Sequence, residues 1–319
     1  MIDGTSDGWY GITDMMDFFR PLLSSPFLGE IMALGAGLVW AFAVILYRTT
    51  GRAVPPLGLN LFKTALGSLL LAATVLAVRQ PLLPASPWQS YALLAASGVI
   101  GITISDTLFF ACLNRLGAGL TGIVDCVNIP FVIVFSFVFI GERLTLRQSL
   151  GVVLILVAIV LVSGKKDAAL PSRKDLLPGI GLGILAMITM AAGIVMIKPL
   201  LRQTPVLWAT FLRSASAAAA LAVVMLFHPR RAPILRPLRI PANWRPMVPA
   251  VVLGSYIALL AWMAGMKFTQ ASVAAPLSQL NSVFIFILAA IFLKEKITGV
   301  KTAAVVLATL GAVFVSWPG

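Results

Sequence analysis

The chain contains the same apolar segment twice, and this repeat constrains its fold more than any other feature of the sequence. Residues 116–163 align with residues 269–316 at a constant offset of 153, without a gap. The matches include polar residues that apolar composition alone would not bring into register: Asn128 with Asn281, Glu142 with Glu295 and Thr145 with Thr298. Duplicated membrane units are typical of transporters built from two related halves, with the binding site where the halves meet.

Apolar runs long enough to cross a bilayer recur along the whole chain. Of its 319 residues, 60% are hydrophobic and 11% charged, and the mean hydropathy is +1.00. Because backbone polar groups in lipid need internal partners, such runs fold as helices. We predict an all-α integral membrane protein with ten transmembrane helices at residues 28–48, 56–78, 88–111, 117–140, 147–163, 177–198, 205–227, 246–266, 270–293 and 298–316.

The repeat extends toward the start of each half. At an offset of 150, Pro55, Leu57 and Lys63 match Pro205, Leu207 and Arg213. The repeated unit is therefore five spans long, and since five is odd, the second unit enters the membrane from the opposite side. We expect an N-terminal tail (1–27), a first five-helix repeat (28–163), a linker (164–176) and a second, inverted five-helix repeat (177–316).

The net charge of +13 is best explained by the membrane. Basic residues in short loops fix orientation and contact anionic lipid headgroups, so nucleic acid is not an expected partner. We name side X the side that carries the loops after spans 1, 3, 5, 7 and 9. It holds fifteen Lys and Arg against seven on the other side. This excess predicts that side X is cytoplasmic and that both termini lie outside.

Four of the ionisable side chains inside the predicted spans stand out: Lys63, Asp106, Asp125 and Arg213. Each costs about 2.5–3.5 kcal/mol near the bilayer centre, so each needs a reason. Helical rise places the first three in one layer near side X, where they could pair. A purely structural role stays open. In that case Lys63 extends its ammonium group toward side X, and Asp106 or Asp125 serves only as its ion-pair partner.

Polar residues also recur at helical spacing in the two repeated spans. Thr121, Asp125 and Asn128 stand at i, i+4 and i+7, and Ser278 and Asn281 are the polar counterparts in the second copy. A polar stripe facing lipid is costly, so we expect both stripes to face a common interior, with the asparagines near the midplane. The alternative is that the asparagines only join helices by hydrogen bonds.

Aromatic residues offer walls for such an interior. Trp40 lies in the first predicted span, Phe109 in the third, and Trp262 is the counterpart of Phe109 in the eighth. Aromatic side chains in spans also serve as packing or interface residues. We include Trp40 and Trp262 in the predicted substrate site.

A family resemblance rests on the residues that join the last two spans of each half. The run Gly141-Glu142-Arg143-Leu144-Thr145, which follows a span containing Pro130 and leads into Gln148 and Gly151, resembles the EamA-like repeat of the drug/metabolite transporter superfamily. Lys294-Glu295-Lys296-Ile297-Thr298 is the second copy. The resemblance covers residues 28–316. It implies ten helices, a central cavity and the transport of amino acids, other metabolites or drugs.

We therefore expect a secondary transporter, not an enzyme, that moves a small polar metabolite such as an amino acid by alternating access. The substrate site is expected at Asn128, Asn281, Asp125, Asp106, Lys63, Arg213, Thr121, Ser278, Trp40 and Trp262. If transport is coupled to protons, Asp106 or Asp125 is the expected carrier. The protein is expected in a cell membrane, such as a bacterial inner membrane, as a monomer or homodimer.

Three alternatives remain at this stage: an exporter of amphipathic drugs or toxic compounds, a non-transporting membrane scaffold and a membrane-embedded enzyme. The enzyme would need clustered metal ligands or catalytic groups at a membrane face. The chain has one histidine, His228, and two cysteines, Cys112 at the end of the third predicted span and Cys126 inside the fourth. We expect no metal ion and no other cofactor.

Overall fold

The described part of the chain consists of helices joined by turns and short irregular connections. The computed structural model describes residues 28–140, 146–164, 171–201, 203–268, 278 and 280–316, and contains no strand within them. The predicted tail and the residues Glu142, Arg143 and Thr145 of the first family motif lie outside the described residues. An all-helical chain agrees with the requirement that backbone groups in lipid bond within their own segment.

The described residues of the first half form eight helical segments. They are α2 (Leu28–Thr50), α3 (Pro56–Ala77), α4 (Trp88–Gly98), the π-helical segment η1 (Val99–Ile104), α5 (Ser105–Leu116), α6 (Ala118–Asp125), α7 (Asn128–Ile140) and α8 (Leu146–Gly164). Segments α4, η1 and α5 follow one another without a break and cross the bundle together.

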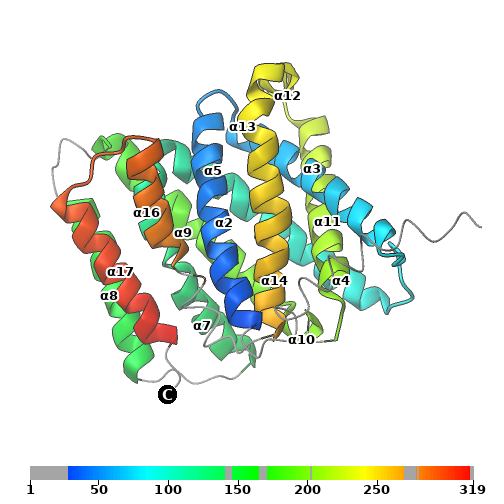
Figure 1. Ribbon diagram of the computed structural model, residues 1–319, viewed down its shortest axis with the longest axis horizontal. Helices are drawn as coiled ribbons and strands as arrows, with labels where there is room; N and C mark the ends of the chain where they lie inside the picture. Colours follow the sequence, from blue (N-terminus) through cyan, green and yellow to red (C-terminus); the bar gives the residue numbers. More distant parts are fainter. Residues whose placement is uncertain are drawn as a thin grey trace, which may run out of the picture.

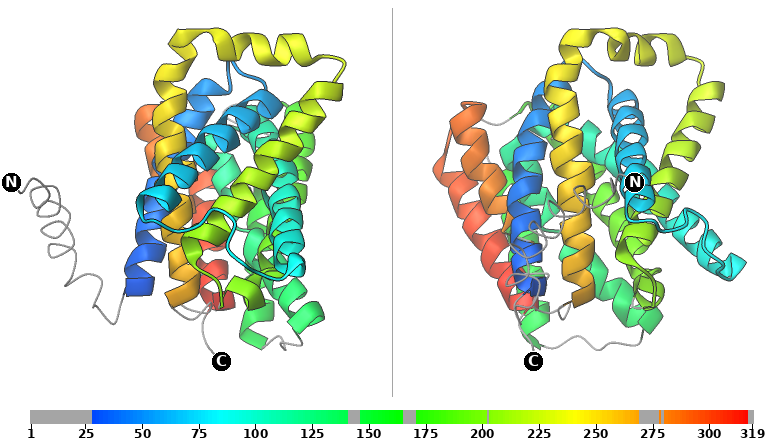
Figure 2. Two further views of the ribbon diagram at one scale, coloured as in Figure 1. Left: turned by 90° about the vertical axis from the view of Figure 1, so that its right-hand side faces the viewer. Right: turned by 45° about the vertical axis from the view of Figure 1, so that its right-hand side comes forward.

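The described segments of the second half follow this order without a counterpart of α6, and they include a short extra helix of four residues and one larger addition. Its segments are α9 (Arg173–Val195), α10 (Lys198–Leu201), α11 (Val206–Phe227), α12 (Arg231–Leu235), the 3-10 helix η2 (Arg236–Arg239), α13 (Pro241–Val251), the π-helical segment η3 (Val252–Ala258), α14 (Leu259–Phe268), α16 (Asn281–Phe292) and α17 (Gly299–Ser316). The larger addition is α12 with η2, which crosses one end of the bundle (Figure 2).

Seven helical stretches among the described residues are long and apolar enough to span a membrane. They are Leu28–Thr50, Pro56–Ala77, Trp88–Leu116, Ala118–Phe139, Arg173–Val195, Val206–Phe227 and Pro241–Gly265. Shorter apolar helices at Ser149–Ala158, Asn281–Phe292 and Gly299–Gly311 occupy the places of the other three predicted spans. The protein is therefore a multi-pass membrane protein.

One predicted span is interrupted where the sequence analysis treated it as continuous. Helix α6 ends at Asp125, α7 begins at Asn128, and Cys126 and Val127 form a turn between them. Pro130 explains the break, because it has no N–H to donate to the carbonyl of Cys126, four residues earlier. Asp125 and Asn128 therefore lie at helix ends in the middle of the bundle.

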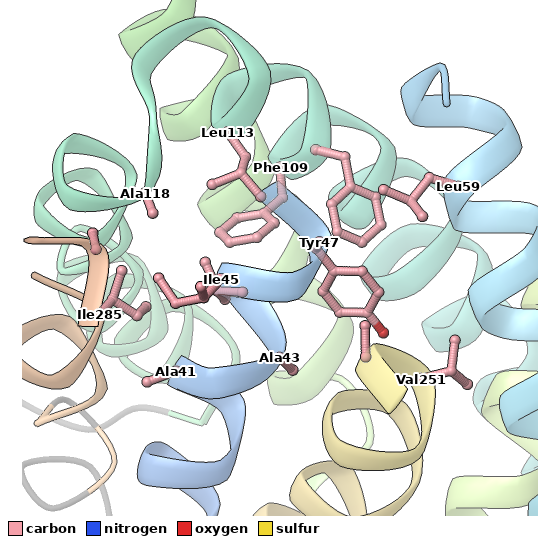
Figure 3. Packing of buried hydrophobic residues seen from close by; sticks show 14 of the residues in the cluster. Ala41, Ala43, Ile45, Tyr47, Leu59, Phe109, Leu113, Ala118, Val251 and Ile285 are labelled. Carbon is pink, nitrogen blue, oxygen red and sulfur yellow. The ribbon is translucent and has the colours of Figure 1, made fainter. Parts of the chain in front are cut away.

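Helices of the two halves pack against each other in pairs. Helix α8 packs on α17, α3 on α11, α5 on α9, and α14 on α2. Figure 1 shows α8 beside α17 at one edge of the bundle, with α2 and α14 near its centre. The interior between α2, α3, α5, α13 and α16 is filled by one apolar cluster that draws side chains from both halves, including Tyr47, Leu59, Phe109, Val251 and Ile285 (Figure 3).

Two helix crossings are so close that they require small residues. A Cβ atom built on Gly193 of α9 would lie 2.7 Å from the Cα of Gly101 in η1. A Cβ atom on Gly254 of η3 would lie 2.8 Å from the Cβ of Ala43 in α2. Small residues at such crossings let helix backbones approach each other, which strengthens packing where lipid supplies no hydrophobic drive.

Candidate functional site

A cavity lies between the two halves and is lined by helices of both. The empty volume between its lining residues is about 1140 Å³, and this value includes the part of the cavity that is open to the outside. All of the predicted site residues except Thr121 line it: Trp40, Lys63, Asp106, Asp125 and Asn128 from the first half, and Arg213, Trp262, Ser278 and Asn281 from the second. The repeat thus brings together residues that are far apart in sequence.

Lys63 of α3 forms an ion pair with Asp106 of α5 in this cavity. Both side chains are buried, and the Lys63 ammonium also lies 6.0 Å from the centre of the Trp40 ring and 5.6 Å from that of Phe110. The pairing that the sequence left open is therefore with Asp106. The opposite charges cancel within the pair, which reduces the cost of burying either one.

Asn60, one helical turn before Lys63, fixes the π-helical segment against α3. Its Nδ2 atom donates to the carbonyls of Ile102 and Thr103, each at 3.1 Å, and to Thr107 Oγ1 at 2.9 Å. A π segment departs from regular α-helical bonding, so its carbonyls can accept side-chain donors. The sequence analysis missed Asn60, although a lone Asn in an apolar span is itself a signal.

Asp125 has a different partner, on the other half of the molecule. Asn281 Nδ2 donates to Asp125 Oδ2 at 2.9 Å, and Asn281 Oδ1 accepts a hydrogen bond from Ser282 Oγ at 3.0 Å. Within the described residues, no cationic group forms an ion pair with Asp125. Its carboxyl group therefore lines the cavity with an amide as its partner and with no ion-pair partner among the described residues.

Arg213 of α11 is the corresponding positive group. Its guanidinium is buried, and Nη1 donates to the sulfur of Met263 at 3.4 Å, a weak acceptor. Its Nε atom has no hydrogen-bond partner among the described residues. No carboxylate in the described part of the chain forms an ion pair with it. Arg213 therefore has unused donors in the cavity lining.

Two further polar atoms in the lining lack partners within the described residues. They are Asn128 Oδ1 and Ser278 Oγ, both buried. A buried polar atom without a partner costs about 1–3 kcal/mol, so such atoms mark places where a ligand or water completes the bonding. Asn128 and Asn281, which the repeat relates, therefore differ. The side-chain amide of Asn281 donates a hydrogen bond to Asp125, whereas the side-chain carbonyl oxygen of Asn128 has no partner among the described residues.

The expectation that Thr121 faces the same interior is wrong. Thr121 is buried outside the cavity lining, and its hydroxyl donates to the carbonyl of Gly117 at 2.6 Å. It also lies 3.8 Å from the sulfur of Cys112. A threonine hydroxyl in a span can bond to the carbonyl four residues earlier, so it needs no polar cavity.

The walls of the cavity are aromatic and thioether-rich. Trp40 lies against Phe109, with ring centres 5.9 Å apart, and Trp262 lines the same cavity from α14. Met187 and Met190 of α9 complete the apolar lining and were not predicted. Methionines in apolar runs carry no distinguishing sequence signal. Together with the acidic and basic groups, these walls suit a small ligand that carries charged groups and an apolar part.

The comparison with known families identifies the chain. A family model described as the EamA-like transporter family matches residues 27–164 and again residues 177–317. The chain belongs to the EamA-like transporter family. This family is part of the drug/metabolite transporter superfamily. The match confirms the family resemblance that rested on the two sequence motifs at residues 141–145 and 294–298. Its members are membrane transporters and not enzymes.

Other comparisons add information about the fold only. A solved structure titled "Crystal structure of protein" matches this EamA-like chain with a TM-score of 0.67 and 21% sequence identity, covering 91% of this chain and 96% of that one. At that identity the likeness supports the fold and nothing finer. No curated protein matches the chain. A second family model, described as serine rich endogenous peptide, matches only residues 145–192, which overlap both EamA-like matches.

Proposed function

We propose that this protein is a secondary transporter that moves a small zwitterionic metabolite, such as an amino acid or a related compound, across a cell membrane. The observation that carries the proposal is that Asp125 from the first half and Arg213 from the second both line the cavity, and that neither forms an ion pair within the described residues. A carboxylate suits an amine and a guanidinium suits a carboxylate, so the two groups match the two ends of a zwitterion.

We further propose ten membrane crossings, in two inverted five-helix repeats that rock against each other for alternating access. The order of elements supports this arrangement. Segments η1 and η3 begin at Val99 and Val252, and helices α7 and α16 begin at Asn128 and Asn281, each pair at an offset of 153. Helix α5 packs on α9 of the other half, and α14 packs on α2, as a pseudo-twofold axis requires.

Within this proposal Asp125 is the better proton carrier of the two acids. Asp106 is neutralised by Lys63, so protonating it would break a buried ion pair. Asp125 accepts a hydrogen bond from the Asn281 amide and forms no ion pair within the described residues. Either a bound proton or the amine of a substrate would neutralise the Asp125 carboxylate. Binding of the substrate can therefore displace the proton, and binding of a proton can displace the substrate.

The test is transport in vesicles loaded with a panel of amino acids and related compounds. Asp125→Asn and Arg213→Gln are each expected to lower the flux of the transported compound at least tenfold. The matched controls are Asp175→Asn and Arg115→Gln, which remove exposed charges elsewhere. Full flux in both cavity variants, with unchanged pH dependence for Asp125→Asn, would remove the basis of the proposal.

A second function, export of amphipathic drugs, is favoured by one observation: Trp40, Phe109, Trp262, Met187 and Met190 form an apolar lining. It predicts that vesicles move cationic amphipathic dyes and that Arg213→Gln leaves this flux intact. A non-transporting scaffold predicts that no solute moves at all, and a membrane-embedded enzyme predicts a chemically altered product. The same vesicle assay therefore separates all of these functions.

A further inference from the structure

The connection between α11 and α13, residues 229–245, is strongly basic and is named here the arginine segment. It holds five arginines, Arg230, Arg231, Arg236, Arg239 and Arg245, and no acidic residue. No aspartate or glutamate occurs anywhere between residues 176 and 294. The equivalent connection in the first half, residues 78–87, contains a single arginine. The arginine segment is therefore a feature of the second half alone.

The arginine segment has a fixed structure that is packed on the bundle. The carbonyl of Ile234 comes so close to α3 that a Cβ atom on Gly58 would lie 2.9 Å from it. Leu238 packs on the apolar cluster that contains Leu59 and Met247. The Trp244 indole donates to the carbonyl of Leu238 at 2.7 Å. Apolar side chains thus anchor the segment. Its backbone crosses one end of the bundle (Figure 2).

The charges point away from this anchor. All five arginines are exposed. Among the bonds of these five side chains within the described residues, only the guanidinium of Arg231 donates to a carbonyl, that of Leu226 at 3.1 Å. Like charges gathered on a short segment repel each other, so the surface attracts multivalent or repeated anions. Because spans end directly beside it, the nearest dense array of anions is the headgroup layer of the membrane.

Two exposed apolar side chains on the same segment favour an anion that also carries apolar chains. Ile240 and Trp244 are each 48% exposed, although both are large and apolar. Trp is favoured at the level of lipid headgroups, where its ring contacts acyl chains and its N–H contacts polar groups. Nucleic acid or a free phosphate would use the arginines but would leave these two side chains in water.

We propose that the arginine segment binds anionic phospholipid headgroups, with the phosphates on Arg236, Arg239 and neighbouring arginines and the acyl chains against Ile240 and Trp244. Trp244 also contacts Phe62 of α3 edge-on, with ring centres 5.5 Å apart, and Phe62 precedes Lys63 of the cavity. Bound lipid therefore holds the segment on the helix that carries Lys63.

The test is lipid binding to the purified full chain, measured by native mass spectrometry with phosphatidylglycerol and phosphatidylcholine. Wild-type protein is expected to retain phosphatidylglycerol at least tenfold more strongly. The variant R236Q/R239Q should lose about fivefold in affinity per arginine removed, and R236K/R239K should keep most of it. The matched control R173Q/K174Q removes two exposed basic charges from a helix that also carries Asp175.

Three results would overturn the proposal. The first is equal retention of phosphatidylglycerol and phosphatidylcholine by wild-type protein. The second is an equal loss of affinity in R236Q/R239Q and R173Q/K174Q, which would show a general charge effect. The third is full displacement of phosphatidylglycerol by an equal concentration of inorganic phosphate, which would make the surface a free-anion site. None of these measurements depends on the transported substrate.

Discussion

Asn281 of the second half donates a 2.9 Å hydrogen bond to the carboxylate of Asp125 in the first half. Its symmetry partner Asn128 makes no such bond, and its carbonyl oxygen has no partner among the described residues. The two repeats therefore have the same residue at this position, but the two asparagines make different hydrogen bonds. One asparagine positions the acid, and the other has an acceptor left for a ligand.

This difference predicts unequal effects of two equivalent substitutions. Asn281→Ala leaves a buried carboxylate without its donor and should destabilise the protein by about 1–3 kcal/mol. Asn128→Ala removes a carboxamide whose oxygen has no partner among the described residues, so the melting temperature in detergent should fall less than for Asn281→Ala while transport falls about tenfold. Equal destabilisation of both variants would contradict the distinction.

The Lys63–Asp106 pair predicts a non-additive result. Lys63→Met leaves Asp106 buried without its cation and should cost about 3–5 kcal/mol. Adding Asp106→Leu to Lys63→Met removes the second charge and should restore most of the lost stability, because a buried pair can often be replaced by apolar residues at little cost. Thermal melts of the single and double variants measure the coupling. Simple additivity would show that the two charges do not depend on each other.

The crossing of Gly193 and Gly101 predicts a steric effect on both stability and rocking. Gly193→Ala places a methyl group 2.7 Å from the Cα of Gly101, so the helices must separate. We expect a loss of about 1–3 kcal/mol and slower transport. Gly181→Ala on the same helix is the control, because no atom of the described residues lies within 4 Å of its Cβ position. Alanine there should be neutral or stabilising, by about 1 kcal/mol at most.

Glu295 of the family motif holds the start of α6 in the other half. Its carboxylate accepts hydrogen bonds from the backbone N–H groups of Ala118 at 2.8 Å and Gly119 at 3.2 Å. A carboxylate at a helix N-terminus satisfies free donors and the helix dipole. Glu295→Ala should therefore cost about 0.5–2 kcal/mol, measured by thermal melts.

Two further variants test this capping role of Glu295. Lys296→Gln changes an exposed neighbouring side chain and should be silent. Gly117→Ala should match or exceed the effect of Glu295→Ala, since Gly117 has a φ of +83° and its Cβ would lie 2.8 Å from Glu295 Oε1. A melting temperature for Glu295→Ala equal to that of Lys296→Gln would exclude the cap.

Much of the cavity was predictable because symmetry and charge both mark it. Two matched asparagines and a matched Lys63/Arg213 pair at constant offsets select the positions where the halves meet, and mid-span charges require an interior. Hydropathy cannot give the rotation of one helix relative to another, so depth alone did not decide whether Lys63 pairs with Asp106 or Asp125.

The remaining differences come from local backbone chemistry. A continuous apolar run hides the break that Pro130 introduces between α6 and α7, and it hides the π segment that Asn60 fixes. Thr121 was misplaced because polar spacing was taken to require a polar surface, whereas its hydroxyl bonds within its own helix. These features depend on individual donors and acceptors, which composition averages away.

The most direct test of the zwitterion site compares a transported amino acid with its methyl ester and its N-acetyl derivative. Wild-type protein in vesicles should bind the free amino acid about ten- to a hundredfold more tightly than either derivative, since each lacks one charged contact. Arg213→Gln should abolish the preference over the methyl ester alone, and Asp125→Asn the preference over the N-acetyl derivative alone. Wild-type protein that binds all three compounds equally, or variants that lose both preferences together, would contradict the account.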